Sequence, residues 1–434
     1  MGSRRERVTR RKFLGDAVRV TAGAALFSIV PAHVVAGLRR GRKPPSETVT
    51  RAVVGSGGMG MSHIEPNKKG ETPSTLAVCD VDADHLAEGL KKAGEGCTPY
   101  HDFRRVLERK DIDTIHVVTP PHWHALISIA AMQAGKDVMC EKPITKFHRE
   151  GLVMIDCARR YGRILNVNTY GRDGSEKLRK VVASGLLGSP ITARLNPKNG
   201  AEWKVAMWSG RTDLVPEPVP KALDYDFWLG PAPVKPYHPH RVHQSFRGYW
   251  DYDGGGLADM GMHWMDPVVY ALGVDRVSPS LVEAVAPWPQ HPDAAGMWGK
   301  VTFNWADGTK LIIESDEWGE RVDPKAPFME GPRAKALERD GTETDPPGLF
   351  SQAAGFPVPP RDKSFEDAVK TRDNTGTAKP TVEEAHRTVT LIHLANIAIR
   401  TGRPVRWDSD KERIIGDEAQ NTFLDEPMRA PWHL

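Results

Sequence analysis

Two short segments carry side chains suited to moving a proton beside a reacting oxygen. Lys142 lies in the run CEKPIT, and Asp259 and His263 lie in LADMGMHWMD. Histidine has an ordinary pKa near neutrality and often serves as a general base, while a lysine ammonium can stabilise a developing alkoxide. Asp259 and His263 are four residues apart, so they share one face if the segment is helical. The alternative is that they only cap and pack a helix.

A glycine-rich segment could hold a charged ligand next to these side chains. In VVGSGGMG, glycines stand in GxGxxG spacing after the apolar run 52–54. This spacing permits a tight turn, close approach of a pyrophosphate and tight helix packing, and the following helix start attracts phosphate. Asp80 follows a second apolar run, 76–78, where a carboxylate would bind ribose hydroxyls and repel a 2′-phosphate. We therefore expect NAD rather than NADP, held by Gly55, Gly57, Gly58, Met59, Gly60 and Asp80.

Apolar runs and helical stretches alternate through the first half of the chain. Residues 114–118, 137–140 and 164–167 predict strands, and 125–134 and 151–161 predict helices. Such alternation predicts a doubly wound parallel sheet, which binds ligands beyond the carboxyl ends of its strands. The segments TPPHWHA and CEKPIT should therefore face the cofactor, although His124 could instead be a helix-start residue. The expected contacts are Thr119, Pro120, His124, Glu141 and Lys142.

The combined motifs resemble those of the Gfo/Idh/MocA oxidoreductases from about Thr48 to the end of the chain. The motifs are GSGGMG, CDVD, TPPHWHA, CEKP, DFWLGPAP, GGGLADMGMHWMD and LANIAIRTGRPVRWD. The resemblance implies that Lys142, Asp259 and His263 line a substrate pocket and that the Lys142–Pro143 bond is cis. It also implies oxidation of a secondary hydroxyl of a sugar, glycoside or polyol, with His263 as the base, Lys142 on the reacting oxygen and Asp259 orienting hydroxyls or the imidazole.

Other side chains are candidates for contacts with such a substrate. Asp266 could bind a further hydroxyl, and NVNTYGRDG departs from the family pattern by placing Tyr170 and Arg172 at a strand end. An aromatic-rich stretch from 201 to 266 suits stacking on a sugar face, with ordinary core packing as the alternative for most of its rings. From it we select Tyr237, Arg241 and His243. HPHRVH lacks a CxxC or HExxH partner, so no metal site is predicted.

The chain divides into a leader and two domains in this interpretation. Residues 1–43 contain TRRKFL and an apolar stretch, a pattern typical of a leader for twin-arginine export. The twin-arginine translocase is then an expected partner. The leader is either cleaved or kept as a membrane tether. Residues 44–170 form the NAD-binding Rossmann domain. Residues 171–434 form an α+β domain with an open, mainly antiparallel sheet that serves homo-oligomer contacts in the resembling family. We expect a long irregular loop over 319–362, a helix over 382–400, a tail that packs back on the body, and a structural role for His386.

Composition excludes some other classes. The formal charge of +3 is concentrated in the leader, because residues 1–43 hold eleven Lys or Arg and two Asp or Glu, which leaves −6 on the remainder. This balance does not favour nucleic acid as a partner. The four cysteines lack motif spacing, and two lie in predicted buried strands, so we interpret them as apolar fillers rather than a disulfide framework.

Export through the twin-arginine route would constrain the chemistry. The route carries folded proteins to a periplasmic or exported location with little free NAD, so we expect a tightly held cofactor that is reduced and reoxidised within one cycle. Coupled oxidation and reduction of two sugars would satisfy this, and so would transient oxidation that permits elimination, hydrolysis or epimerisation. A non-catalytic NAD- or carbohydrate-binding protein is the rival hypothesis, which the intact Lys142, Asp259 and His263 disfavour.

Overall fold

The computed structural model describes residues 48–341 and 343–434. The predicted export segment, within residues 1–43, lies outside the described residues. In the part of the chain that is described, no helix is both long enough and apolar enough to cross a membrane.

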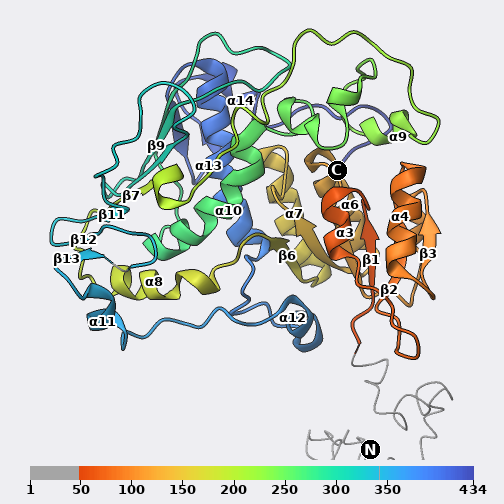
Figure 1. The fold of residues 1–434 in the computed structure, drawn as a ribbon, viewed down its shortest axis with the longest axis horizontal. Coiled ribbons are helices and arrows are strands. Elements are labelled where there is room, and N and C mark those ends of the chain that lie inside the picture. Colours follow the sequence, from red (N-terminus) through yellow and green to blue (C-terminus); the bar gives the residue numbers. More distant parts are fainter. Residues whose placement is uncertain (1–47, 342) are drawn as a thin grey trace, which may run out of the picture. The chain divides into compact units, whose positions relative to one another are not determined.

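The first sheet has six parallel strands in the order β3-β2-β1-β4-β5-β6 (Figure 1). Every residue of β1, β4 and β5 is buried, and because side chains alternate between faces, both faces of the sheet are covered. The order reverses between β1 and β4, which is where a doubly wound sheet binds its ligand. The predicted fold class is confirmed. The bounds are β1 Arg51–Val54, α3 Gly58–His63, β2 Thr75–Cys79, α4 Ala83–Ala93, β3 Thr98–Tyr100, α5 Phe103–Leu107, β4 Thr114–Val117, α6 His124–Gln133, β5 Asp137–Glu141, α7 His148–Tyr161 and β6 Leu165–Asn168.

Two glycines after β1 are required by close backbone contacts. Gly55 has φ +91°, and a Cβ built on it would lie 2.6 Å from the carbonyl oxygen of Val118 after β4. A Cβ on Gly60 would lie 1.9 Å from the Gly55 carbonyl oxygen. The turn after β1 and the start of α3 therefore pack at a distance that only glycine allows.

The second sheet has nine strands in the order β13-β12-β11-β7-β10-β9-β8-β14-β15. Only the β7–β10 pair is parallel among its described pairs, which confirms a mainly antiparallel sheet. The expectation of an irregular loop over 319–362 is wrong in part, because this stretch supplies β11, β12, β13 and α11. The bounds are β7 Thr192–Leu195, β8 Leu281–Val285, β9 Lys300–Asn304, β10 Lys310–Glu314, β11 Met329–Glu330, β12 Lys335–Ala336, β13 Thr344–Asp345, α11 Leu349–Ala353, β14 Val405–Asp408 and β15 Arg413–Ile414.

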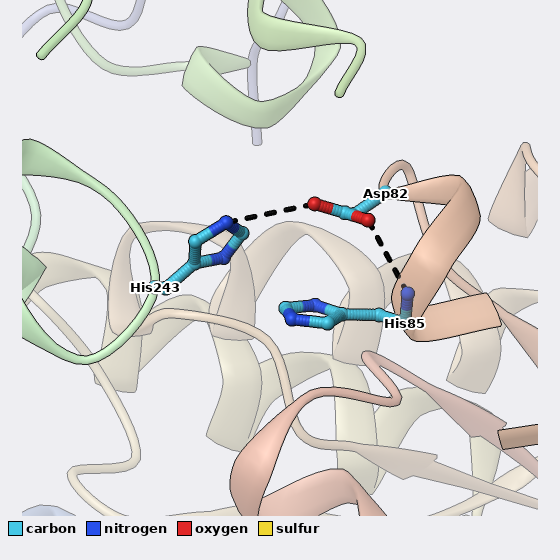
Figure 2. Close-up of side chains that lie close together, drawn as sticks. All are labelled: Asp82, His85 and His243. Atoms are coloured by element: carbon cyan, nitrogen blue, oxygen red, sulfur yellow. Dashed lines mark hydrogen bonds and ion pairs between the residues drawn. The ribbon is translucent and has the colours of Figure 1, made fainter. Parts of the chain in front are cut away.

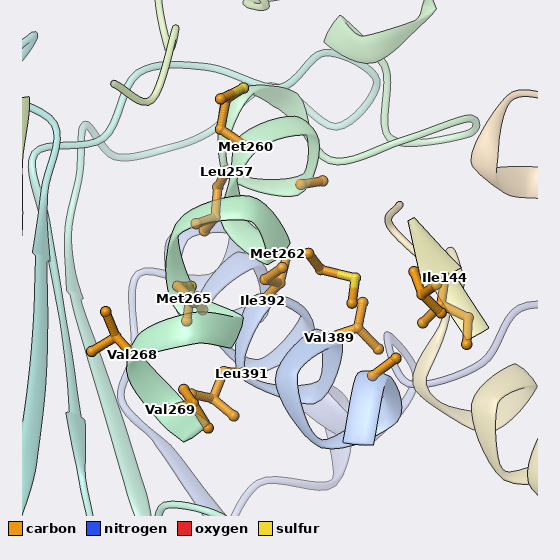
Figure 3. Packing of buried hydrophobic residues seen from close by; sticks show 14 of the residues in the cluster. Ile144, Leu257, Met260, Met262, Met265, Val268, Val269, Val389, Leu391 and Ile392 are labelled. Carbon is orange, nitrogen blue, oxygen red and sulfur yellow. The ribbon is translucent and has the colours of Figure 1, made fainter. Parts of the chain in front are cut away.

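A buried helix pair, α10 Gly255–Leu272 and α13 Val382–Thr401, fixes the segment that carries Asp259 and His263 (Figure 3). A Cβ on Gly261 of α10 would lie 2.7 Å from Cδ1 of Ile392 on α13, so the two helices cross closely. Leu257, Met265 and Val389 pack in the same core. The remaining α-helices among the described residues are α8 Glu176–Ala183, α9 Tyr225–Leu229, α12 Phe365–Thr371 and α14 Glu418–Asn421.

The carboxy-terminal tail packs on the body, as predicted. The Trp432 ring stacks on Phe227 at 5.8 Å between centroids and meets the edge of Trp123 at 4.7 Å. Trp123 follows β4 in the half of the chain that forms the parallel sheet, so the end of the chain contacts that half.

Candidate active site

A large cleft of about 1140 Å³ lies at the carboxyl ends of the parallel strands. Its walls come from the loops after β1, β2, β4, β5 and β6, from α10, and from the segment 239–247. Of the predicted residues, the cleft is lined by Gly55, Gly57, Gly58, Met59, Asp80, Thr119, Pro120, Glu141, Lys142, Tyr170, His243, Asp259 and His263.

Lys142 and Asp259 form a buried ion pair in the wall of this cleft. The Lys142 Nζ atom lies 2.7 Å from Oδ1 of Asp259 and 2.8 Å from the Asp259 carbonyl oxygen. The Lys142–Pro143 bond is cis, as the resemblance implied. Arg247 Nε donates to the same Oδ1 at 2.7 Å. Burial opposes the charge of this carboxylate, but Lys142 and Arg247 hold the pKa of Asp259 well below its usual range.

His263 lies one helical turn from Asp259 and is stacked by an exposed aromatic ring. The Tyr170 ring lies 4.0 Å from the imidazole between centroids, at an interplanar angle of 8°. Burial and the nearby Lys142 charge lower the pKa of His263 to about 4. The imidazole is therefore neutral at pH 7 and has a lone pair available for a proton. Asp259 makes its hydrogen bonds to Lys142 and Arg247, so the carboxylate orients the lysine rather than the imidazole.

The glycine loop, residues 55–60, leaves room for a flat, charged ligand. A Cβ on Gly58 would meet no atom within 4 Å, so this wall is open. Asp80 accepts from Ser56 N at 2.7 Å and from Asp82 N at 2.9 Å, and its oxygens keep lone pairs for further donors. Thr119 and Pro120 form the opposite side of the cleft. These residues fit a dinucleotide: the glycine loop would hold its diphosphate, and Asp80 would bind a ribose.

A histidine from the second half of the chain reaches the Asp80 end of the cleft. His243 Nε2 lies 3.5 Å from Asp82 Oδ2, and its ring centroid lies 4.6 Å from that of His85 (Figure 2). Asp82 also caps α4 by accepting from His85 N. The three side chains offer ligand atoms within 4.8 Å of one another, but His85 and His243 are substantially exposed and line the proposed nucleotide site.

Glu141 is the last residue of β5 and lines the cleft next to Lys142. It accepts from Asn168 Nδ2 at 2.6 Å and lies 2.8 Å from His63 Nε2. Burial opposes its ionisation, but these two partners lower the pKa of Glu141 overall. The Glu141 carboxylate therefore stays charged and fixes the strand end that carries Lys142.

Several predicted substrate or cofactor contacts do not line the cleft. Tyr237 is buried in an apolar cluster with Tyr225, and Arg241 binds Asp293 at 2.5 Å. His124 contacts the carbonyl oxygens of Thr119 and Pro143, each at 2.7 Å. The structure therefore favours the helix-start alternative for His124, which ties together the loops after β4 and β5. Gly60 does not line the cleft either, and its role is to let the start of α3 pack closely on the turn after β1.

Arg172 and Asp266, both predicted to contact substrate, are instead paired with each other. Both side chains are fully buried, with Arg172 Nη2 2.7 Å from Asp266 Oδ1. Arg172 Nη1 also meets Asp275 at 2.9 Å and Glu384 at 3.0 Å. The prediction was wrong because these acidic partners lie far away in the sequence. His386 also lies outside the cleft, in agreement with its predicted structural role.

Replacing Arg172 with methionine should lower the free energy of unfolding by roughly 3–5 kcal/mol, because Asp266 would keep a buried charge without its main partner. Urea unfolding of the purified protein measures this. Arg406→Met removes an exposed arginine on β14 and should change stability by under about 0.5 kcal/mol. Equal losses in the two variants would show that the Arg172 network does not stabilise the fold.

Sequence reasoning missed Arg247 and Asp253, which line the cleft. Arg247 binds Asp259, and its guanidinium lies 5.0 Å from the ring centroid of Trp208, which belongs to the predicted aromatic-rich stretch and also lines the cleft. Burial raises the pKa of Asp253 to about 7, so this carboxyl can exchange a proton near neutral pH. The GGGLADMG motif directly follows Asp253 and could have drawn attention to it, whereas Arg247 lies in a short 3-10 helix, Ser245–Gly248, without a spacing pattern.

Comparison with known proteins agrees with the fold and the nucleotide site. Residues 49–169 match the oxidoreductase family NAD-binding Rossmann fold, and residues 173–434 match the oxidoreductase family C-terminal alpha/beta domain. An inositol 2-dehydrogenase from Klebsiella pneumoniae subsp. pneumoniae is 29% identical over 151 residues, which cover 34% of this chain and 45% of that protein. A glycosyl hydrolase family 109 protein from Shewanella pealeana is 31% identical over 181 residues, 39% of each chain. The matched segments thus span less than half of these relatives.

Solved structures share the fold at low sequence identity. The WlbA dehydrogenase from Chromobacterium violaceum, in complex with NADH and UDP-GlcNAcA, aligns with a TM-score of 0.55 at 18% identity, over 84% of this chain and 97% of that one. An aldose-aldose oxidoreductase from Caulobacter crescentus aligns with a TM-score of 0.51 at 18% identity, over 83% and 100%. Because the family models cover both halves of the described chain, this protein belongs to the Gfo/Idh/MocA family of NAD-binding oxidoreductases.

Proposed function

We propose that the protein oxidises a secondary hydroxyl of a sugar, glycoside or polyol with NAD. The observation that carries this proposal is the arrangement of Lys142, Asp259 and His263 in the wall of a cleft that the glycine loop also lines. The inositol 2-dehydrogenase relatives support a polyol or sugar as the substrate class. Asp80 favours NAD, because its carboxylate would repel a 2′-phosphate.

The side chains divide the proton chemistry between them. When bound, the nicotinamide supplies the acceptor for a hydride, that is, for the hydrogen on the oxidised substrate carbon together with two electrons. Lys142 uses two of its three ammonium donors on Asp259, which leaves the third for the substrate oxygen. This donor would stabilise negative charge on that oxygen as its proton leaves. Neutral His263 would take the proton, directly or through Lys142.

The cleft lining suits a polyhydroxylated ring. Tyr170, stacked on His263, and Trp208 offer flat apolar surfaces for the C–H face of a sugar. Arg247, Asp253 and Lys204 offer charged or polar groups for hydroxyls around the same space. This lining is the support for a carbohydrate rather than an apolar alcohol.

A redox-neutral reaction is the second candidate, and the glycosyl hydrolase family 109 relatives favour it. Transient oxidation of a ring carbon acidifies the neighbouring C–H, so a glycosidic bond can break by elimination. Water then adds, and the ring carbon is reduced again, so no electrons are gained or lost overall. Such a cycle needs a tightly held cofactor. The proposed twin-arginine export, directed by residues 1–43, also calls for one, because the location outside the cytoplasm would hold little free NAD. Asp253, with its pKa near 7, is the cleft residue suited to removing the ring proton.

Nicotinamide fluorescence of the purified full chain tests both candidates. We expect denatured protein to release NAD or NADH, and one compound from a panel of sugars, glycosides and inositols to raise the fluorescence without added nucleotide. A lasting signal indicates net oxidation, whereas a signal that decays with glycoside cleavage or epimerisation indicates the redox-neutral cycle. Loss of nucleotide on dialysis would refute tight binding. No response from the panel, even with NAD added, would refute the proposed oxidation.

A further inference from the structure

Three side chains outside the cleft lie close to one another in the interior of the protein. They are His148 at the start of α7, His386 on α13, and Glu412 in the turn between β14 and β15. One ligand atom from each lies within 4.8 Å of the other two. His148 is 2% exposed, His386 is 1% exposed and the Glu412 side chain is 19% exposed. None of the three lines the large cleft.

The hydrogen bonds around His148 determine which of its ring nitrogens has a lone pair beside Glu412. The Thr390 hydroxyl donates to the His386 carbonyl oxygen at 2.7 Å, so its oxygen can only accept from His148 Nδ1, 3.3 Å away. The Nδ1 atom therefore carries the proton and Nε2 has the lone pair. A metal-binding histidine commonly has this arrangement, with the second nitrogen donating to a fixed acceptor.

Glu412 is also held by one oxygen and open at the other. Oε1 accepts from Arg387 at 2.9 Å, while Oε2 lies 3.1 Å from His148 Nε2 without the geometry of a hydrogen bond. A lone pair and a carboxylate oxygen at this distance repel each other unless a cation lies between them. Glu412 has φ +46°, a left-handed conformation that costs free energy in a non-glycine residue. The turn is thus held in a strained form that directs the carboxylate inward.

His386 supplies the strongest indication of a missing partner. Neither of its ring nitrogens has a hydrogen-bond partner among residues 48–341 and 343–434, although the side chain is buried. Buried polar atoms without partners are uncommon and costly. A Cβ on Gly151 of α7 would lie 2.2 Å from His386 Nδ1, so glycine is required there to admit the imidazole.

We propose that His148, His386 and Glu412 bind a divalent transition-metal ion, with Zn²⁺ the best match. Two imidazoles and one carboxylate form a ligand set that suits zinc, and a water molecule can complete a tetrahedron. The ion would join α7, α13 and the β14–β15 turn, elements that are distant in sequence, and would remove the repulsion between His148 and Glu412. α7 and α13 pack against each other beside the parallel sheet (Figure 1). The site would stabilise the fold and would have no part in the proposed oxidation.

Metal analysis of the full chain tests this inference without relying on activity. We expect about one zinc ion per chain after desalting in chelator-treated buffer, and a rise of a few degrees in the midpoint of thermal unfolding when zinc is restored to the apoprotein. Co²⁺ added to the apoprotein should give the intense visible bands of a tetrahedral site. His386→Asn and Glu412→Gln should each bind zinc at least about tenfold more weakly. His243→Ala, which alters the exposed histidine group at the cleft, should retain the ion.

Each outcome of the experiment decides the question. Wild-type protein that neither retains zinc nor binds Co²⁺ would overturn the proposal and leave an imidazolium–carboxylate pair of His148 and Glu412. Loss of the ion in His243→Ala alone would move the site to the cleft. If His386→Asn and Glu412→Gln do not fold, Thr390→Val keeps the side-chain shape and should weaken zinc binding by about 10–100-fold. Unchanged affinity in this variant would also overturn the proposal.

Discussion

Replacing Lys142 with alanine should lower turnover about ten-thousand-fold while leaving the fold and nucleotide binding in place. The Lys142 ammonium contacts Asp259 and keeps one donor for the substrate oxygen, so its removal takes away both charge stabilisation and a proton path. Arg247 still binds Asp259 in this variant, so the buried carboxylate retains a partner. The protein should therefore fold.

Single-turnover reduction of bound cofactor measures the effect on the chemical step. Lys142→Arg should also be strongly impaired, because the larger guanidinium cannot occupy the same position between Asp259 and the substrate. Lys198→Ala, at an exposed lysine, serves as the control and should keep full activity. If Lys142→Ala retained turnover within about tenfold of the wild type, the assignment of Lys142 to the reacting oxygen would be wrong.

The fold was predictable where strands are long, apolar and buried. β1, β2, β4, β5 and β6 each coincide with an apolar run, because a parallel sheet covered on both faces selects such runs. β3 was missed because its residues, Thr98 to Tyr100, are not fully buried. β11, β12 and β13 have two residues each, too few to show an alternation, and they form through pairing with β7 and with one another.

The candidate site was predictable where its residues share a local motif. Lys142, Asp259 and His263 stand in motifs on a strand end and on one helix, so their meeting in the cleft follows from the doubly wound fold. Arg172 shows the limit, since a buried arginine with distant acidic partners has the same local sequence as one that binds a ligand. His148, His386 and Glu412 were likewise invisible as a group, because packing between three distant elements brings them together.

Acid should destabilise the protein well above the pH at which ordinary carboxylates titrate. Burial is the main cause that lowers the pKa of His122 and His393 to about 3 and of His263 to about 4, and it also holds the pKa of His116 and His386 well below the usual 6.5. Below pH 6.5 the unfolded chain therefore binds protons at these histidines that the folded chain rejects. Glu150 and Asp253 act in the opposite direction, because burial raises both pKa values to about 7 and the folded chain binds their protons first.

The balance of these groups sets the size of the effect. Three histidines with a pKa of about 3 or 4, less the two carboxyls, leave the unfolded chain with about one more proton than the folded chain, and His116 and His386 add to this difference. The free energy of unfolding should therefore fall by at least roughly 1.4 kcal/mol per pH unit between about pH 6 and 5. Urea unfolding at several pH values measures this slope. His122→Gln removes one of these histidines and should reduce the slope by about 1.4 kcal/mol per pH unit, whatever its effect on stability at neutral pH. His433→Gln, at an exposed histidine, should leave the slope unchanged. Two results would mean that these buried histidines are protonated in the folded protein: a slope near zero, or a slope that His122→Gln does not alter. A protonated His263 could not accept the substrate proton.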